Sequence, residues 1–280
     1  MDDAALETWV GRSETVRDLA ASGPLQRLAG LLDHDGARWR PGEVPPLGHW
    51  LYFLPQASQS ELGEDGHPRR GGLLPPVELP RRMWAGGRLK FERPIPLDRP
   101  IDRRSTVTDV KRKVGRSGEM VFVTVLHEIL ADGAVAISEE QDIVYRGEPP
   151  PAPPEVPRAE PPPASASATR RLSAGTVQLF RYSALTFNSH RIHYDRDYAT
   201  GVEGYPGLVV HGPYIATLLM DHFLATRPQA QVTGFTFRAQ RPLFDGTDFT
   251  LNLGETEDGF TLWAADAHER VAMLATVAAR

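Results

Sequence analysis

The residues best suited to acid–base chemistry gather in two short strings in the second half of the chain. The first string, FNSHRIHYD, places Asn188 five positions before His193, and the second, GYPGLVVHG, ends at Gly212. An imidazole with an ordinary pKa of about 6.5 can accept or return a proton near neutral pH. We therefore expect proton transfer at His193, close to the point where the second string runs into an apolar helical pattern.

The residues after Gly212 predict a buried helix whose first amides face the site. Apolar residues recur at helical spacing between positions 215 and 223, and Pro213 suits a first helical turn. A helix start presents unpaired N–H groups and the positive end of a dipole, so it stabilises an oxygen that gains negative charge. One such donor contributes about 3 kcal/mol in a transition state.

Two sets of strand-like runs repeat along the chain, and each set is opened by an Arg-Pro pair. The runs cover residues 105–111, 120–129 and 134–145, and then 249–253, 260–268 and 271–278. The second run of each set ends in His-Glu, which suggests a shared register. We expect a duplicated unit in which these strands, with a further strand at 177–185, form an antiparallel sheet around the apolar helix.

A proline-rich stretch divides the chain. Residues 148–170 are dense in Pro, Ala and Ser without hydrophobic periodicity, so we expect an extended linker between an N-terminal half, 1–147, and a C-terminal half, 171–280. In the first half, residues 47–53 predict a shorter helical counterpart, and the Gly- and Pro-rich loop 55–80 predicts a functional or capping excursion. The expected fold class is α+β, with two antiparallel sheets that each wrap a central helix.

The composition excludes several classes of function. The 280 residues include no cysteine, which removes thiolate nucleophiles, thiolate metal sites and disulfides. A net charge of -5 without a basic run gives no electrostatic footprint for nucleic acid or anionic lipid. No apolar stretch approaches the roughly 18 residues of a spanning helix, and the acidic amino terminus is unlike a targeting segment. We expect a cytoplasmic protein with no nucleic-acid or membrane partner.

The two chemical strings closely resemble the signature of the MaoC-like and R-specific enoyl-CoA hydratase family. That signature is an acidic residue, four intervening positions and a His, followed later by His-Gly at the start of the central helix. His193, His211 and Gly212 match it, whereas Asn188 stands at the acidic position. The longer string 180–195, with HWLYF and RMWAGG in the first half, is most similar to the branch of mesaconyl-C4-CoA hydratases and mitochondrial-type 3-hydroxyacyl-thioester dehydratases.

The resemblance implies a double hot dog fold and a hydro-lyase. The reaction would be the reversible addition of water across the 2,3 double bond of a 2-enoyl thioester. The resemblance implies no metal and no redox cofactor, because CoA enters only as part of the substrate. The expected partner is an acyl-CoA or acyl carrier protein thioester, and the expected assembly is a homodimer.

Three residues are expected to act in the reaction itself. His193 would activate water and return a proton to the α-carbon, the Gly212 amide would polarise the thioester carbonyl, and Asn188 would position the water, because an amide cannot act as a base. Further residues are expected to bind the substrate, the two arginines by holding a carboxylate: Tyr205, Gly207, His211, Arg191, Arg181 and Trp50. Five other histidines are expected to be structural or at the surface: His34, His67, His127, His222 and His268.

Three other functions stay open at this point. His193, Asp195 and His211 have the residue types of a two-His, one-carboxylate iron site. The same fold can hydrolyse thioesters, although that branch generally needs an acidic residue where Asn188 stands. A module that binds acyl thioesters without catalysis would also explain the missing acid.

Overall fold

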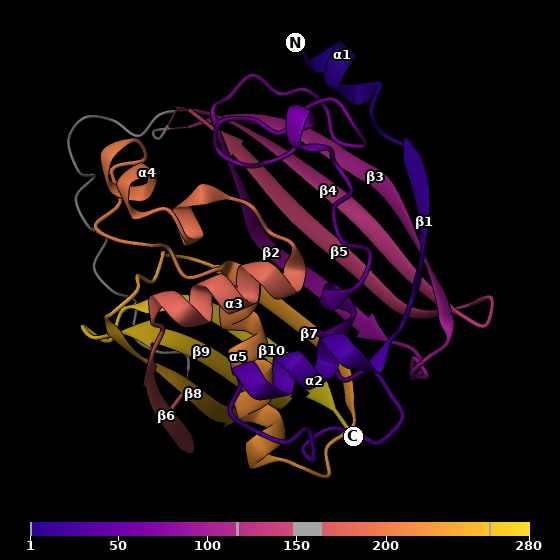
Figure 1. Ribbon diagram of the computed structural model, residues 1–280, viewed down its shortest axis with the longest axis vertical. Coiled ribbons are helices and arrows are strands. Elements are labelled where there is room, and N and C mark those ends of the chain that lie inside the picture. Colours follow the sequence, from indigo (N-terminus) through magenta and orange to yellow (C-terminus); the bar gives the residue numbers. More distant parts are fainter. Residues whose placement is uncertain (1, 116–117, 148–163, 258) are drawn as a thin grey trace.

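The computed structural model describes residues 2–115, 118–147, 164–257 and 259–280, and it contains a ten-stranded antiparallel sheet (Figure 1). The strand order across this sheet is β1-β3-β4-β5-β2-β7-β10-β9-β8-β6. The N-terminal half supplies β1 (Ser13–Leu19), β2 (Arg81–Phe91), β3 (Pro100–Gly115), β4 (Gly118–Ala131) and β5 (Ala134–Arg146). The C-terminal half supplies β6 (Ala168–Ser173), β7 (Val232–Ala239), β8 (Asp248–Thr256), β9 (Gly259–Asp266) and β10 (Val271–Ala279).

The two halves join where β2 pairs with β7. Five residue pairs run from Gly86 opposite Arg238 to Lys90 opposite Gly234. Each half therefore covers the sheet edge that the other would expose, which removes two edges prone to aggregation. The expected pair of sheets is confirmed, in the form of one continuous surface.

The same pair of backbone hydrogen bonds occurs in both halves, as expected of a duplicated unit. The two residues before Pro94 both donate to the carbonyl of Ala136, at 2.8 and 3.2 Å. The two residues before Pro242 donate in the same way to the carbonyl of Ala272, at 2.8 and 3.1 Å. The Arg-Pro pairs thus mark equivalent turns. Each turn is hydrogen-bonded to the last strand of its half, β5 or β10.

The shared His-Glu pair is a coincidence of sequence. His127 and Glu128 lie inside β4, where the ring of His127 contacts Ser105 and Gln141. His268 and Glu269 lie beyond the end of β9, in the turn before β10. Register therefore differs at this point, and the prediction of a shared position is wrong.

The C-terminal half wraps a central helix as expected. Helix α5 (Gly212–Thr226) is buried continuously from Tyr214 to Leu224 and packs against β8, β9 and β10 (Figure 1). An apolar helix that is covered on all sides needs such an enclosure.

The predicted strand at 177–185 is wrong, because those residues belong to helix α3 (Thr176–Thr186). Leu179, Tyr182 and Ser183 are buried, whereas Val177 and Phe180 are exposed. Buried residues spaced three and four apart fit a helical period, and a short apolar run cannot be assigned by pattern alone. Helix α2 (Ser22–Leu31), which packs against α3, follows β1 as α3 follows β6.

Among the described residues of the N-terminal half, no long central helix is present. The predicted counterpart at 47–53 is a single 3-10 turn, η1 (Gly48–Leu51), and the following loop contains only the short turn η2 (Gln59–Glu61) before β2. The sheet face that a full helix would fill is therefore free to border a cavity.

The remaining short elements lie at the chain start and, in the sequence, between α3 and α5. They are α1 (Asp3–Glu7), η3 (Arg191–His193) and α4 (Arg196–Gly201). Most of the predicted linker, 148–163, lies outside the described residues, and β6 begins at Ala168, three residues before the predicted domain start. Within the described ranges, no helix has the length and apolar character needed to cross a membrane.

Replacing Gly86 by alanine should weaken the seam between the halves. A Cβ at this position would lie 2.5 Å from the carbonyl oxygen of Phe237, which is backbone and cannot swing aside. Overpacking of this kind costs about 1–3 kcal/mol, so Gly86→Ala should lower the free energy of unfolding in urea by that amount. Gly115→Ala is the matched control, because a Cβ there meets nothing within 4 Å. Equal stability of the two variants would contradict this expectation.

Candidate active site

His193 ends the turn η3 and is held by a backbone carbonyl. Its Nδ1 lies 2.7 Å from the carbonyl oxygen of Val209, and the residue is only 7% exposed. A carbonyl oxygen can only accept, so Nδ1 carries the proton and Nε2 keeps its lone pair. Burial lowers the pKa of His193 to about 4, so the ring is neutral near pH 7. This is the tautomer of a general base.

A second imidazole connects His193 to the start of α5. The rings of His193 and His211 stack with centroids 3.7 Å apart, and His211 is the N-cap residue immediately before Gly212. His211 is fully buried, and its Nε2 lies 2.8 Å from the Ser183 hydroxyl on α3. Burial lowers the pKa of His211 well below its usual value. The predicted base and the predicted oxyanion donor are therefore neighbours.

Asn188 lies just after α3 and shapes the turn that leads to His193. Its amide oxygen accepts the backbone N–H of His190 at 3.0 Å, and its own N–H donates to Ser183 at 2.9 Å. The amide oxygen of Asn188, which was expected to orient water, thus already accepts one hydrogen bond. Its second lone pair can still accept one from water. The side chain remains half-buried at the cavity described next.

A cavity of about 980 Å³ lies beside the motif and extends over the N-terminal sheet. Asn188, Ser189, Pro213 and residues of α3 line its C-terminal side. Residues of η1, of the loop 52–74 and of strands β1 to β5 line the rest. The rings of His193 and His211 do not line it, but Asn188 and Pro213, which do, flank them in the chain. The cavity occupies the space left by the shortened N-terminal helix.

Trp50 lines this cavity, as expected of a substrate-binding residue. Its indole is hydrogen-bonded to Glu139, which is buried beside His49. Its Nε1 donates to Glu139 at 3.0 Å, and Glu139 also pairs with His49 at 2.8 Å. Hydrogen bonds and charge from His49 oppose the effect of burial and keep the pKa of Glu139 lowered. The carboxylate is thus satisfied by the protein and fixes the cavity wall.

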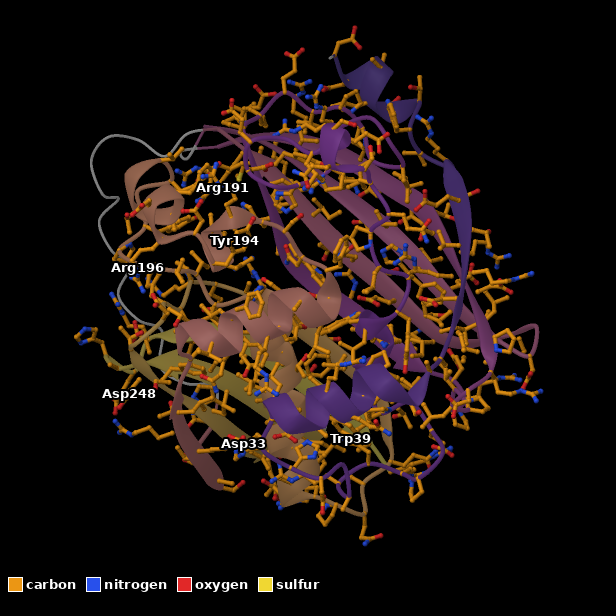
Figure 2. The ribbon with its side chains drawn as sticks, in the orientation of Figure 1. Asp33, Trp39, Arg191, Tyr194, Arg196 and Asp248 are labelled. Carbon is orange, nitrogen blue, oxygen red and sulfur yellow. The ribbon has the colours of Figure 1, made fainter. Side chains whose placement is uncertain are left out.

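The two predicted carboxylate-binding arginines lie elsewhere. Arg191 pairs with Asp195 at 2.7 Å and stacks over Tyr198, on the side of the molecule that carries α4 (Figure 2). Arg181 is exposed on α3 and approaches Gly30 of α2. Neither arginine is among the residues that line the cavity.

Tyr205 and Gly207 belong to the loop that precedes α5, outside the cavity lining. The Tyr205 ring lies 6.1 Å from that of Phe244. Gly207 passes so close to Asp245 that a Cβ would meet its Oδ1 at 2.8 Å, while that oxygen accepts the N–H of Leu208. These contacts fix the loop that delivers His211 and the helix start.

One cluster was not anticipated from the sequence. Asp65, His67 and His190 place one potential ligand atom each within 4.8 Å of one another, in a region that also contains His193. His67 had been expected to be structural, and the only signal in the sequence was the loop 55–80 that contains it. The residue types are those of a cation site, but both carboxylate oxygens of Asp65 already accept hydrogen bonds from His67, at 2.9 Å each.

Comparison with known proteins decides the family. The model of hydroxyacyl-thioester dehydratase type 2 matches residues 46–245. The chain belongs to this family. Over 282 residues it is 45% identical to the mesaconyl-C(4)-CoA hydratase of Chloroflexus aurantiacus, covering 99% of each chain. It is 27% identical to the mitochondrial hydroxyacyl-thioester dehydratase type 2 of Schizosaccharomyces pombe, over 76% of this chain and 78% of that one.

Solved structures confirm the predicted fold. A MaoC-like dehydratase superposes with a TM-score of 0.72 at 16% identity, covering 98% of this chain and 99% of that one. HtdX of Mycobacterium tuberculosis superposes with a TM-score of 0.68 at 19% identity, covering 96% and 100%. The predicted double hot dog architecture is confirmed, and the family identifies the protein as a hydro-lyase.

Replacing the imidazole of His193 should remove most of the activity of this dehydratase. A placed acid–base group contributes roughly 10²–10⁴ in rate, so His193→Ala should lower kcat for thioester hydration by that factor. His268→Ala, in an exposed turn, is the matched control. Retention of near wild-type kcat by a folded His193→Ala protein would remove this assignment.

The buried imidazoles should make the dehydratase sensitive to acid. Burial lowers the pKa of His190 to about 2, that of His193 to about 4, and that of His211 well below its usual value. Below about pH 6.5 these rings bind protons in the unfolded chain but not in the folded chain. Their contribution to the free energy of unfolding is therefore full above about pH 6.5 and falls as the pH falls. Each such group contributes a slope of up to about 1.4 kcal/mol per pH unit.

Urea unfolding between pH 7 and pH 5 measures that slope directly. His193→Gln, which removes one of the three groups, should show a shallower slope than the wild-type protein. A free energy of unfolding that does not change over this range would contradict the assignment of neutral buried rings.

Proposed function

We propose that this protein reversibly adds water across the double bond of a mesaconyl-type thioester. The 45% identity to a mesaconyl-C(4)-CoA hydratase across 99% of both chains is the observation that carries the proposal. A mesaconyl group is an unsaturated, methyl-substituted dicarboxylic unit, so its monothioester keeps one free carboxylate. The substrate therefore demands a cation in the cavity as well as groups for proton transfer.

Arg82 of β2 is the cation in the best position for that carboxylate. It lines the cavity and lies beside the Tyr145 hydroxyl. That hydroxyl is buried, lines the same cavity and has no hydrogen-bond partner of good geometry among the described residues. A guanidinium and a phenol that converge on one space form a suitable carboxylate site.

The reacting end of the substrate would lie between this site and the start of α5. The thioester oxygen would accept the N–H of Gly212, which stabilises the enolate that forms when water attacks the β-carbon. His193 supplies Nε2 as the base for water, because Asn188 cannot take a proton. Arg82 would hold the carboxylate, which is attached to the same β-carbon in a C4 thioester.

The arginine-rich mouth of the cavity supports CoA as the carrier. A smaller cavity of about 520 Å³ shares His67, Arg69, Arg70 and Arg82 with the large one. Its lining also includes Arg81. With Arg82 assigned to the carboxylate, the guanidinium groups of Arg69, Arg70 and Arg81 suit the phosphates of CoA.

The assembly is proposed to be a homodimer. Val177 and Phe180 expose 68% and 63% of their surface on α3, which offers an apolar face for a second copy. Size-exclusion chromatography with light scattering would test this, with Phe180→Lys expected to shift the protein toward monomer. The cytoplasmic location remains a prediction, which cell fractionation would test.

A spectrophotometric screen at the enoyl thioester absorbance tests the reaction. Crotonyl, longer 2-enoyl and mesaconyl thioesters of CoA would be compared, and we expect the mesaconyl C4 thioester to give the highest kcat/KM. Absence of hydration with every substrate would contradict the proposal.

Replacing Arg82 tests substrate recognition separately from chemistry. Arg82→Met keeps the length of the side chain and removes its charge. A charged hydrogen bond contributes about 1.5–3 kcal/mol, so kcat/KM for the mesaconyl thioester should fall roughly tenfold to a hundredfold. Crotonyl thioester, which lacks the carboxylate, should be little affected. Arg181→Met is the matched control, and a larger effect there than at Arg82 would reverse the assignment.

A further inference from the structure

Hydration requires a second proton transfer, which His193 alone was expected to make but which a second group nearer the cavity could make instead. Water must lose a proton as it attacks the β-carbon, and the α-carbon must gain one. In many enzymes two groups with different environments share these roles. Asn188 stands where the family has its acidic residue. Any second group must therefore come from outside the motif.

His67 is the imidazole of this region that borders the cavities. It lines both the large and the small cavity, whereas neither His190 nor His193 lines either of them. Its side chain is 24% exposed. The ring is thus accessible to a bound acyl group in the way that a proton donor must be.

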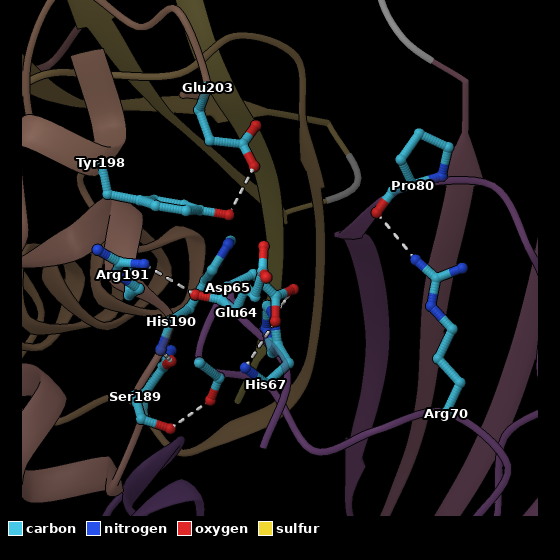
Figure 3. Close-up of polar contacts among 12 residues, drawn as sticks. Glu64, Asp65, His67, Arg70, Pro80, Ser189, His190, Arg191, Tyr198 and Glu203 are labelled. Carbon is cyan, nitrogen blue, oxygen red and sulfur yellow. Dashed lines mark hydrogen bonds and ion pairs between the residues drawn. The ribbon is translucent and has the colours of Figure 1, made fainter. Parts of the chain in front are cut away.

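Asp65 fixes the orientation of His67. The Oδ2 atom of Asp65 accepts Nδ1–H of His67 at 2.9 Å, and Oδ1 accepts the backbone N–H of the same residue at 2.9 Å (Figure 3). With Nδ1 engaged, Nε2 is the nitrogen left for substrate. The carboxylate also stabilises the imidazolium form, as the Asp of a catalytic triad does.

The loop that carries Asp65 and His67 is docked firmly on the C-terminal motif. The hydroxyl of Ser189 donates to the carbonyl of Gly66 at 2.5 Å, and the backbone N–H of Arg191 donates to the carbonyl of Asp65 at 2.9 Å. A Cβ on Gly66 would lie 1.9 Å from the carbonyl oxygen of Ser189. The two halves therefore meet here without space for even one extra carbon.

The imidazoles form a row from the cavity into the core. The ring centroids of His67 and His190 lie 4.0 Å apart, and those of His190 and His193 lie 5.4 Å apart. Within this row as described, His67 is the member with a carboxylate partner. Burial lowers the pKa of His67, while the hydrogen bond that its ring donates to Asp65 opposes that effect.

The surroundings of His67 disfavour a bound divalent cation. Both oxygens of Asp65 are used by His67. The positive charges of Arg82 and Arg70 also act on the His67 ring. A divalent cation at this place would face two guanidinium groups and would have to displace two hydrogen bonds.

We propose that His67, oriented by Asp65, is the acid that protonates the α-carbon during hydration. This role rests on the proposed hydratase function. As the oxygen of water bonds to the β-carbon, one O–H bond breaks and its proton goes to Nε2 of His193, while the double-bond electrons move to the α-carbon and the thioester carbonyl. The N–H bond at Nε2 of protonated His67 then breaks, and its proton bonds to the α-carbon.

The cycle closes by transfer of one proton from His193 back to His67. His190 lies between the two rings and offers a path, as does solvent in the cavity. In the dehydration direction the same groups act in reverse, and His67 takes the α-proton. His67 is the catalytic residue of this proposal, and Asp65 is its positioning residue.

The test compares His67→Ala and Asp65→Asn with the wild-type protein. With the mesaconyl or the best 2-enoyl thioester, His67→Ala should lower kcat by about 10²-fold or more and change KM little. Added imidazole should restore part of that kcat, because the deleted ring leaves space at the cavity. Asp65→Asn should lower kcat by a smaller factor without altering KM.

Exchange of the α-proton in D₂O separates this step from the attack of water. With the hydroxyacyl thioester as substrate, NMR should show that His67→Ala loses α-proton exchange and that imidazole restores it. His268→Ala, in the exposed turn between β9 and β10, should match the wild-type protein in every readout. His67→Gln gives a second variant if the alanine protein does not fold.

Several outcomes would overturn the proposal. These are a kcat of His67→Ala within about threefold of wild type, an effect on KM alone, or stoichiometric metal in the purified protein together with loss of activity on chelation. If the wild-type protein hydrates no enoyl thioester, the proposed function fails together with this inference. If the wild-type protein is active and His67→Ala keeps its rate, only the role of His67 fails.

Discussion

Hydrogen bonding between β2 and β7 holds both halves of the chain in one sheet, and the site depends on that pairing. The C-terminal half supplies the first turn of α5 and the proposed base, His193, whose Nδ1 carries the proton. The N-terminal half brings the cavity wall, Arg82 and the loop that carries His67. In the proposed mechanism, neither half contains a complete set of groups for hydration. The relative position of the halves is therefore as important for catalysis as the position of any single side chain.

Burial keeps the imidazoles of the site neutral, and it also lowers the stability of the fold in acid. His193 and His211 lose the stabilisation of their charged forms when water is excluded, so both stay neutral near pH 7. The Val209 carbonyl and the Ser183 hydroxyl compensate by satisfying one nitrogen of each ring. A neutral ring such as that of His193, whose Nδ1 carries the proton, can act as a base without prior loss of a proton. The same arrangement makes the folded state less tolerant of acid.

The sequence could predict what depends on local pattern. The alternating strands, the apolar helix α5 and the Arg-Pro turns follow from residue spacing, and the motif histidine follows from its resemblance to a known signature. Helix α3 was missed because its apolar residues fit two periods over a short run. His67 was missed because its neighbours, Ser189 and His190, lie more than a hundred positions away in the sequence. Contacts of that kind depend on tertiary structure.

Because η1 is only a single short turn, the two halves of the chain have different roles. Helix α5 packs against the sheet of the C-terminal half, whereas the sheet of the N-terminal half borders the large cavity. Substitutions on β4 and β5 can therefore change which acyl groups fit, while the proton-transferring imidazoles stay in place. Related enzymes with this architecture could diversify in substrate size through one half and conserve their reaction through the other.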